Sequence, residues 1–154
     1  MIASAFTCTG PYAVLIMLGI KRVENRSVMP APAEDAARLF HAAVPITGRM
    51  EGFFVLPLDD VGCAISAPVL VSLGHENGTT AVDPREVFGE ALKAGARSIV
   101  VAHNHPSGDL TPSRADIAMT AKLREAGNML GVSLLDHLIL GSDSKFAIVN
   151  SAKG

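Results

Sequence analysis

The spacing of apolar residues divides the second half of the chain into alternating helices and strands. Apolar residues recur at helical spacing within Val87–Leu92, after the capping sequence Asp83-Pro84 and before a glycine. Continuous apolar runs within 97–105 and 132–140 are typical of buried strands. Between these runs, residues 111–131 have the length and composition of a helix. The pattern predicts helix, strand, helix, strand.

The first half of the chain adds a helix and a pair of strands. Residues 35–44 have helical spacing, and 51–59 and 63–74 are rich in strand-forming residues. Pro57 indicates an edge or a bulge in the first of these strands, because proline donates no ladder hydrogen bond. A last short strand is expected at 145–149. The whole order favours a mixed β-sheet flanked by helices, an α/β (α+β) layered fold.

Composition and charge narrow the class of protein. The 154 residues are 49% hydrophobic and 18% charged, which is typical of a folded domain, and the net charge is −2. The net charge therefore does not support binding to nucleic acid, because phosphate binding needs a surplus of basic residues. The two cysteines, Cys8 and Cys63, form no metal-binding pattern. The early apolar run, residues 13–18, is too short to span a membrane, so we expect a cytoplasmic protein.

Two histidines lie at the end of the strand predicted within 97–105. Because side chains on a strand alternate between its faces, His103 and His105 are expected to point to the same side. Two imidazole nitrogens on one side are half of the ligands of a tetrahedral zinc site. Taken alone, the pair fits a polar strand end better than a metal site.

Asp116 is the natural third ligand, because the loop before its helix can fold back over the strand end. The competing interpretation makes Ser113 the N-cap and Asp116 its capping-box partner, with no metal. Thr111-Pro112 offers another helix start, with threonine as the cap and proline in the first helical position. In that register Asp116 lies one turn inside the helix and is available. This pattern favours the ligand over the pure cap.

Metal-assisted hydrolysis also needs a general base. The acidic candidates before the histidines are Glu51, Glu76, Glu86 and Glu90. Glu86 fits a capping box with Asp83 and Glu90 lies on the same helix, so Glu51, at the start of a strand, is favoured. On local pattern alone, Glu51 is an ordinary solvated residue at a strand start.

The spacing His103-x-His105-x7-Ser113-x2-Asp116 resembles the JAMM (MPN+) metalloprotease motif. The wider sequence resembles the RadC family, because PREVF, HNHPSGD and LLDH occur in the expected order. The resemblance extends back through EGFFVLPLD and covers roughly residues 32–150.

This resemblance implies a cytidine-deaminase-like three-layer αβα fold that holds one Zn²⁺. By the same resemblance, the zinc ligands are His103, His105 and Asp116. Glu51 would activate a water molecule and relay its proton, and Ser113 would help to hold the oxyanion. Deaminase chemistry is not implied, because it needs H-x-E with P-C-x-x-C.

Asp136 and His137 interrupt the apolar strand at 132–140, where buried polar groups need partners. A buried structural hydrogen bond is the favoured interpretation of this pair. Orientation of a zinc-binding histidine is the alternative.

The N-terminal segment, residues 1–30, has a different character. Gly19-x-Lys21-x-x-Glu24-x-Arg26 resembles the signature of ASCH domains, RNA-associated β-barrels. About 25 residues match, too few to close a barrel, so a short helix with a charged tail is favoured and an ASCH-like remnant is the alternative. The predicted division is this segment followed by a RadC-like JAMM domain at 31–154.

Two functions follow as hypotheses. The first is a zinc-dependent metallohydrolase that cleaves an amide or isopeptide bond in a protein or peptide substrate. The alternative is a DNA-repair-associated protein of RadC type, which binds nucleic acid or protein partners and keeps a structural or vestigial metal. The acidity of the chain disfavours the alternative.

Overall fold

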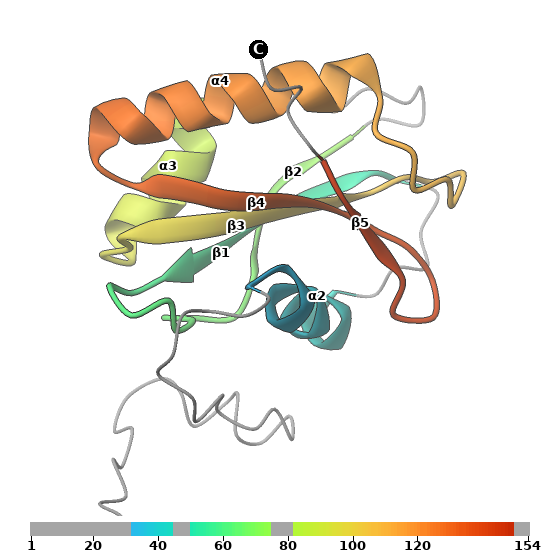
Figure 1. Ribbon diagram of the computed structural model, residues 1–154, viewed down its shortest axis with the longest axis horizontal. Helices are drawn as coiled ribbons and strands as arrows, with labels where there is room; N and C mark the ends of the chain where they lie inside the picture. The colour runs from blue at the N-terminus through green and yellow to red at the C-terminus, as the bar shows by residue number, and fades with distance from the viewer. Residues whose placement is uncertain (1–31, 45–49, 75–81, 150–154) are drawn as a thin grey trace, which may run out of the picture.

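A five-stranded sheet lies between helices on both of its faces (Figure 1). The computed structural model describes residues 32–44, 50–74 and 82–149. Within these ranges the elements are α2 (Pro32–Ala43), β1 (Gly52–Leu58), β2 (Val69–Leu73), α3 (Pro84–Lys93), β3 (Ser98–Asn104), α4 (Arg114–Leu130), β4 (Ser133–Leu140) and β5 (Phe146–Ile148). Helix α2 covers one face, and α3 and α4 cover the other. The predicted three-layer αβα architecture is confirmed.

The strand order is β2-β1-β3-β4-β5. Strands β3 and β4 are parallel and are connected through α4, whereas the other neighbouring pairs are antiparallel. The sheet is therefore mixed, as predicted. Because β1 runs against β3, the start of β1 lies beside the end of β3, with Phe53 paired to His103. This junction carries the candidate site.

Strand alternation sends the buried side chains into two separate cores. On the α2 face, Phe40 packs with Leu56, Val100 and Leu138. On the opposite face, β-strand residues pack against α3 and α4 in a cluster that contains Phe53, Val55, Val87, Phe88, Ile99, Val101 and Leu123. Burial of apolar surface on both sides fixes the sheet as the central layer.

Most element boundaries agree with the predictions, and the starts of α2 and β2 are shifted for local reasons. Helix α2 begins at Pro32, three residues earlier than expected, because proline suits the first helical position and acidic residues follow in the first turn. Strand β2 begins only at Val69, directly after Pro68, and Ala64 makes just an isolated bridge to Leu58.

Pro57 lies inside β1, which is an inner strand of the sheet rather than an edge. It pairs with Ile99 of β3, but the pairing of β1 with β2 ends at Val55. The proline nitrogen is thus accommodated where β2 has already ended, and a register irregularity occurs between Phe53 and Phe54.

The prediction that α4 begins at Thr111 is wrong. The helix begins at Arg114, and Ser113 is its N-cap. The Thr111 amide instead donates to Oδ1 of Asp109 at 2.9 Å, which holds the Thr111-Pro112 segment in the loop. The other end agrees, because Gly131 follows the helix with φ of 70°, a conformation that favours glycine.

Asp83 caps α3 as expected, although its side chain bonds Arg85 rather than completing a box with Glu86. The ASCH-like segment at 1–30 and the candidate base Glu76 lie outside the described residues. No helix in the described part of the chain is long and apolar enough to cross a bilayer.

Candidate metal centre

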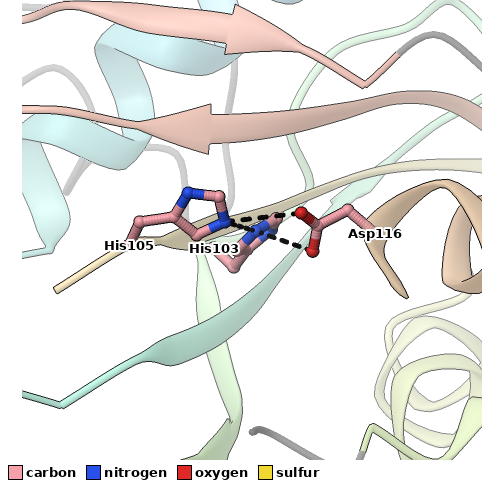
Figure 2. A group of neighbouring side chains, drawn as sticks. All are labelled: His103, His105 and Asp116. Atoms are coloured by element: carbon pink, nitrogen blue, oxygen red, sulfur yellow. Dashed lines mark hydrogen bonds and ion pairs between the residues drawn. The ribbon is translucent and has the colours of Figure 1, made fainter. Parts of the chain in front are cut away.

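Three side chains predicted as metal ligands meet at the end of β3. Nε2 of His103 lies 2.9 Å from Nε2 of His105, as strand alternation predicts for residues two apart. Asp116 reaches both rings from the first turn of α4, with Oδ1 3.2 Å from Nε2 of His103 and Oδ2 3.4 Å from Nε2 of His105 (Figure 2). The structure thus brings together the three side chains that the sequence predicted to converge.

Asp116 caps its helix and faces the histidines at the same time. Its Oδ2 accepts a hydrogen bond from the Ser113 amide at 2.7 Å, while Oγ of Ser113 accepts from the Asp116 amide at 3.1 Å. This is a complete capping box. The cap and the ligand interpretations are therefore compatible, because a carboxylate has enough lone pairs for both.

The charge state of Asp116 suits a cation site. Burial raises the pKa of this carboxyl, but the pKa lies below its ordinary value, because the hydrogen bond that the Ser113 amide donates to Oδ2 stabilises the charged form. Asp116 is thus a carboxylate at neutral pH, with its side chain only 13% exposed.

The loop after β3 sets the orientation of His105. Its Nδ1 lies 2.6 Å from the backbone carbonyl oxygen of Asp109. A carbonyl only accepts, so Nδ1 must carry the proton and donate. The neutral ring of His105 then has its lone pair on Nε2, the atom that faces His103 and Asp116.

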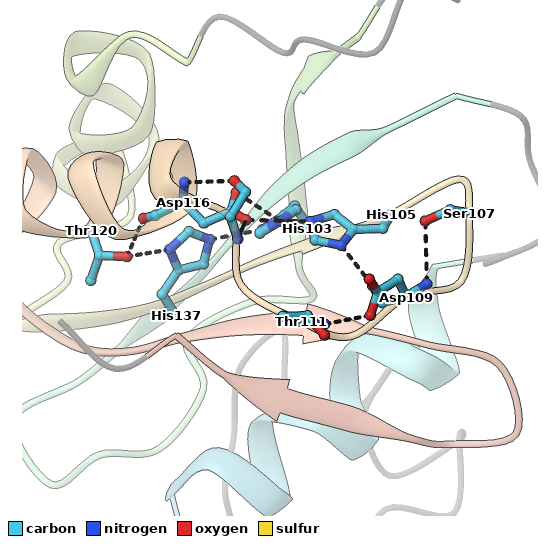
Figure 3. Close-up of polar contacts among 9 residues, drawn as sticks. His103, His105, Ser107, Asp109, Thr111, Asp116, Thr120 and His137 are labelled. Carbon is cyan, nitrogen blue, oxygen red and sulfur yellow. Dashed lines mark hydrogen bonds and ion pairs between the residues drawn. The ribbon is translucent and has the colours of Figure 1, made fainter. Parts of the chain in front are cut away.

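His103 is buried against the rings of Phe53, His105 and His137. It is 1% exposed, and the ring of Phe53 stacks on it with 6.1 Å between centroids. Its Nδ1 lies 2.8 Å from Nε2 of His137 (Figure 3). The buried hydrogen bond predicted for His137 is therefore made to His103, the residue that His137 orients in the alternative interpretation.

Glu51, the predicted base, lies directly before β1. Asn104 fixes this segment against the end of β3: its Oδ1 accepts from the Gly52 amide at 2.9 Å, and its Nδ2 donates to the Met50 carbonyl at 3.1 Å. The Glu51 carbonyl accepts from the Gly74 amide at 2.7 Å. The Glu51 carboxylate makes no hydrogen bond or ion pair with any residue that the structure describes, so the structure places its backbone beside the site and assigns its side chain no partner.

Two other candidate bases, Glu86 and Glu90, lie on α3. Glu90 forms an ion pair with Lys93 at 2.6 Å. Glu86 lies in the first turn of α3. Neither is drawn towards the histidines by a described contact.

The three candidate ligands fit a divalent cation. One nitrogen or oxygen atom from each of His103, His105 and Asp116 lies within 4.8 Å of the others. Two neutral imidazole nitrogens and one carboxylate oxygen are the donor set of many three-ligand zinc sites. His103 is buried, whereas His105 and Asp116 are partly exposed, so the group opens to solvent on one side.

Two residues next to the site escaped the sequence reasoning. Thr120 is fully buried and lies one helical turn after Asp116. Asn104, which lies between the two histidines in the sequence, is also buried. Thr120 could have been noticed in the sequence as a polar residue on the inward face of α4. Asn104 needed the register of β1 against β3, which the sequence alone does not supply.

Comparisons with known proteins give the family. The family model described as "RadC-like JAB domain" matches residues 31–153. A UPF0758 protein of Geotalea uraniireducens is 39% identical over 132 residues, which are 86% of this chain and 56% of that relative. A UPF0758 protein of Caldanaerobacter subterraneus is 55% identical over 118 residues, 77% of this chain and 48% of that relative. The chain spans about half the length of these curated relatives. Since the family model covers most of it, the chain belongs to the RadC-like JAB domain family.

Proposed function

We propose that this domain is a zinc-dependent hydrolase of JAMM type, which cleaves a peptide or isopeptide bond in a protein or peptide substrate. The observation that carries the proposal is the convergence of Nε2 of His103, Nε2 of His105 and the Asp116 carboxylate. Membership of the RadC-like JAB domain family supports it.

Zinc suits the donor set, because imidazole nitrogen with one carboxylate oxygen is a common zinc environment. An ion held by these three residues would supply Lewis acidity and lower the pKa of a coordinated water towards neutrality. His103 is 1% exposed, which keeps its ring in place, whereas Asp116 and His105 are 13% and 17% exposed, so an ion held there would be open to a substrate.

Glu51 is the proposed general base. Phe53 pairs with His103. If the same antiparallel register continued for two more residues, Glu51 would lie opposite His105, and alternation would put its side chain on the face that carries both histidines. Its carboxylate would take a proton from the attacking water and deliver it to the leaving nitrogen of the amide.

Ser113 is the proposed oxyanion donor. In the capping box its Oγ accepts a hydrogen bond from the Asp116 amide, so the hydroxyl proton itself is not used in that contact. The hydroxyl therefore remains able to donate to an oxyanion that forms beside Asp116. The same box fixes the side chain close to the candidate ligands.

The test compares wild type with Glu51→Gln and with Glu90→Gln, a matched change at a rejected candidate base. Zinc content and hydrolysis of a set of fluorogenic peptides and isopeptides are measured on the same preparations. We expect Glu51→Gln to keep its zinc and to lose about 10²- to 10⁴-fold in turnover, as for removal of a general base.

Glu90→Gln should retain both zinc and turnover. Freshly purified wild type without zinc would contradict the proposal. So would equal hydrolysis by wild type and Glu51→Gln.

A further inference from the structure

A chain of short contacts leads from His103 into the core and ends on the backbone of Asp116 (Figure 3). Nδ1 of His103 lies 2.8 Å from Nε2 of His137, and Nδ1 of His137 lies 2.7 Å from Oγ1 of Thr120. Oγ1 of Thr120 lies 2.7 Å from the carbonyl oxygen of Asp116. His103, His137 and Thr120 are each 1% exposed or less, so water does not complete these contacts.

The threonine hydroxyl sets the direction of this chain. It has one proton and two partners, each at 2.7 Å. The Asp116 carbonyl can only accept, so the hydroxyl proton must be donated there. The hydroxyl oxygen must then accept from His137, which requires the proton of that ring to be on Nδ1.

The proton of His137 also fixes the direction of its hydrogen bond with His103. The ring of His137 is 1% exposed, and burial disfavours a charged imidazolium, so the ring is neutral and carries one proton. With that proton on Nδ1, Nε2 of His137 is an acceptor. Nδ1 of His103 must therefore be the donor of their hydrogen bond.

We propose that Thr120 and His137 are positioning residues, which hold the proton of His103 on Nδ1 and thereby leave the lone pair on Nε2 aimed at the metal position. The chain starts at one proposed ligand and ends on the main chain of another, so it also ties the ring of His103 to the first turns of α4. The inference rests on the proposed metal site.

The loop contact of His105 has the same effect by a different route. The Asp109 carbonyl accepts a hydrogen bond from Nδ1 of His105. Because a carbonyl can only accept, this contact alone fixes the proton on Nδ1. His103 instead bonds another histidine, whose ring can donate or accept at either nitrogen. Thr120 removes that ambiguity. As a result, three acceptors face one another at the site, an arrangement that a cation stabilises.

The first experiment needs no variant and no metal. Long-range ¹H–¹⁵N correlation spectra of ¹⁵N-histidine-labelled, metal-free protein at neutral pH report which ring nitrogen carries the proton. We expect the Nδ1–H form for both His103 and His137. The Nε2–H form for both rings would overturn the inference.

The second experiment removes the hydroxyl of Thr120. Thr120→Val keeps the shape of the side chain but removes the acceptor, so His137 is free to place its proton on Nε2 and drive the His103 proton onto its own Nε2. Zinc affinity, measured by competition with a chelator, should fall about 10- to 100-fold, as for other residues that orient a metal ligand.

Thr120→Ser is the matched variant, because it restores the hydroxyl with a similar backbone preference. We expect it to recover most of the affinity and the wild-type tautomers. A folded Thr120→Val protein that binds zinc as tightly as wild type would overturn the inference. If that variant does not fold, the wild-type spectra still decide.

The two proposals fail in different ways. Wild type that binds no zinc but shows Nδ1–H at both rings would refute the metal site and leave the tautomer assignment standing. Wild type that binds zinc but shows Nε2–H at both rings in the metal-free state would refute the positioning role alone.

Discussion

Between α2 and the sheet, the core is built from apolar side chains around Phe40, whereas on the opposite face the core changes from apolar to polar towards the end of β3. Val101 lies beside His137 across β3 and β4, and His103 follows two residues later on the same face. Apolar packing is not directional, so the stability of the core on the α2 face depends on how well the side chains fill its volume. At the polar end of the other face, the arrangement of the side chains depends on which atom donates in each hydrogen bond.

The difference predicts that changes on the two faces have separable consequences. Loss of volume on the α2 face should reduce the free energy of unfolding and leave the candidate ligands as they are. Loss of one donor or acceptor on the α3/α4 face should change the candidate site with a smaller effect on stability.

Phe40→Ala is expected to give the largest change in stability. Phe40 is fully buried against the sheet, so its truncation removes apolar contacts and leaves a cavity. The free energy of unfolding of the metal-free protein, measured with denaturant, should fall by about 3–5 kcal/mol. Zinc affinity of the molecules that remain folded should not change. A parallel loss of zinc affinity would show that the two faces are coupled.

A smaller effect is expected from acidification. An unfolded chain protonates His137 near its ordinary pKa of 6.5, whereas the folded chain resists protonation until about pH 3. The unfolded state therefore binds more protons in this window, and stability falls as the pH falls from 6.5 towards 3, with a slope of at most about 1.4 kcal/mol per pH unit. The depressed pKa of Asp116 adds acid lability below its ordinary 3.8.

His137→Gln should lose the His137 part of this slope, because glutamine does not titrate. The measurement is the unfolding free energy of metal-free wild type and variant at a series of pH values. Equal slopes for the two proteins would contradict the buried, neutral state of His137.

The two faces also differ in how far the sequence predicted them. Strands and helices of both faces followed from apolar spacing, because burial imposes a period of two or 3.6 residues. The pairing of His103 with His105 followed from the same alternation. Asp116 followed from a loop that can fold back over the strand end, together with a resemblance to a known motif.

The start of α4 was not predicted, because Thr111-Pro112 and Ser113 are both good helix starts by local rules. The choice is made by the loop, in which Asp109 binds the amide of Thr111 and the imidazole of His105. Thr120 was not predicted either, since its role depends on a strand, β4, that follows α4 in the chain and meets it only in the folded protein.

The most direct test of the metal centre is a zinc titration that gives the number of bound ions and their affinity. Asp116→Asn can keep the hydrogen bond to the Ser113 amide while losing the charge that faces His103 and His105. Asp83→Asn makes the same change at the cap of α3, away from the histidines. We predict one tightly bound zinc per chain in wild type and Asp83→Asn, and at least about 10-fold weaker binding in Asp116→Asn. Zinc binding that is absent in wild type, or equal in wild type and Asp116→Asn, would contradict the account.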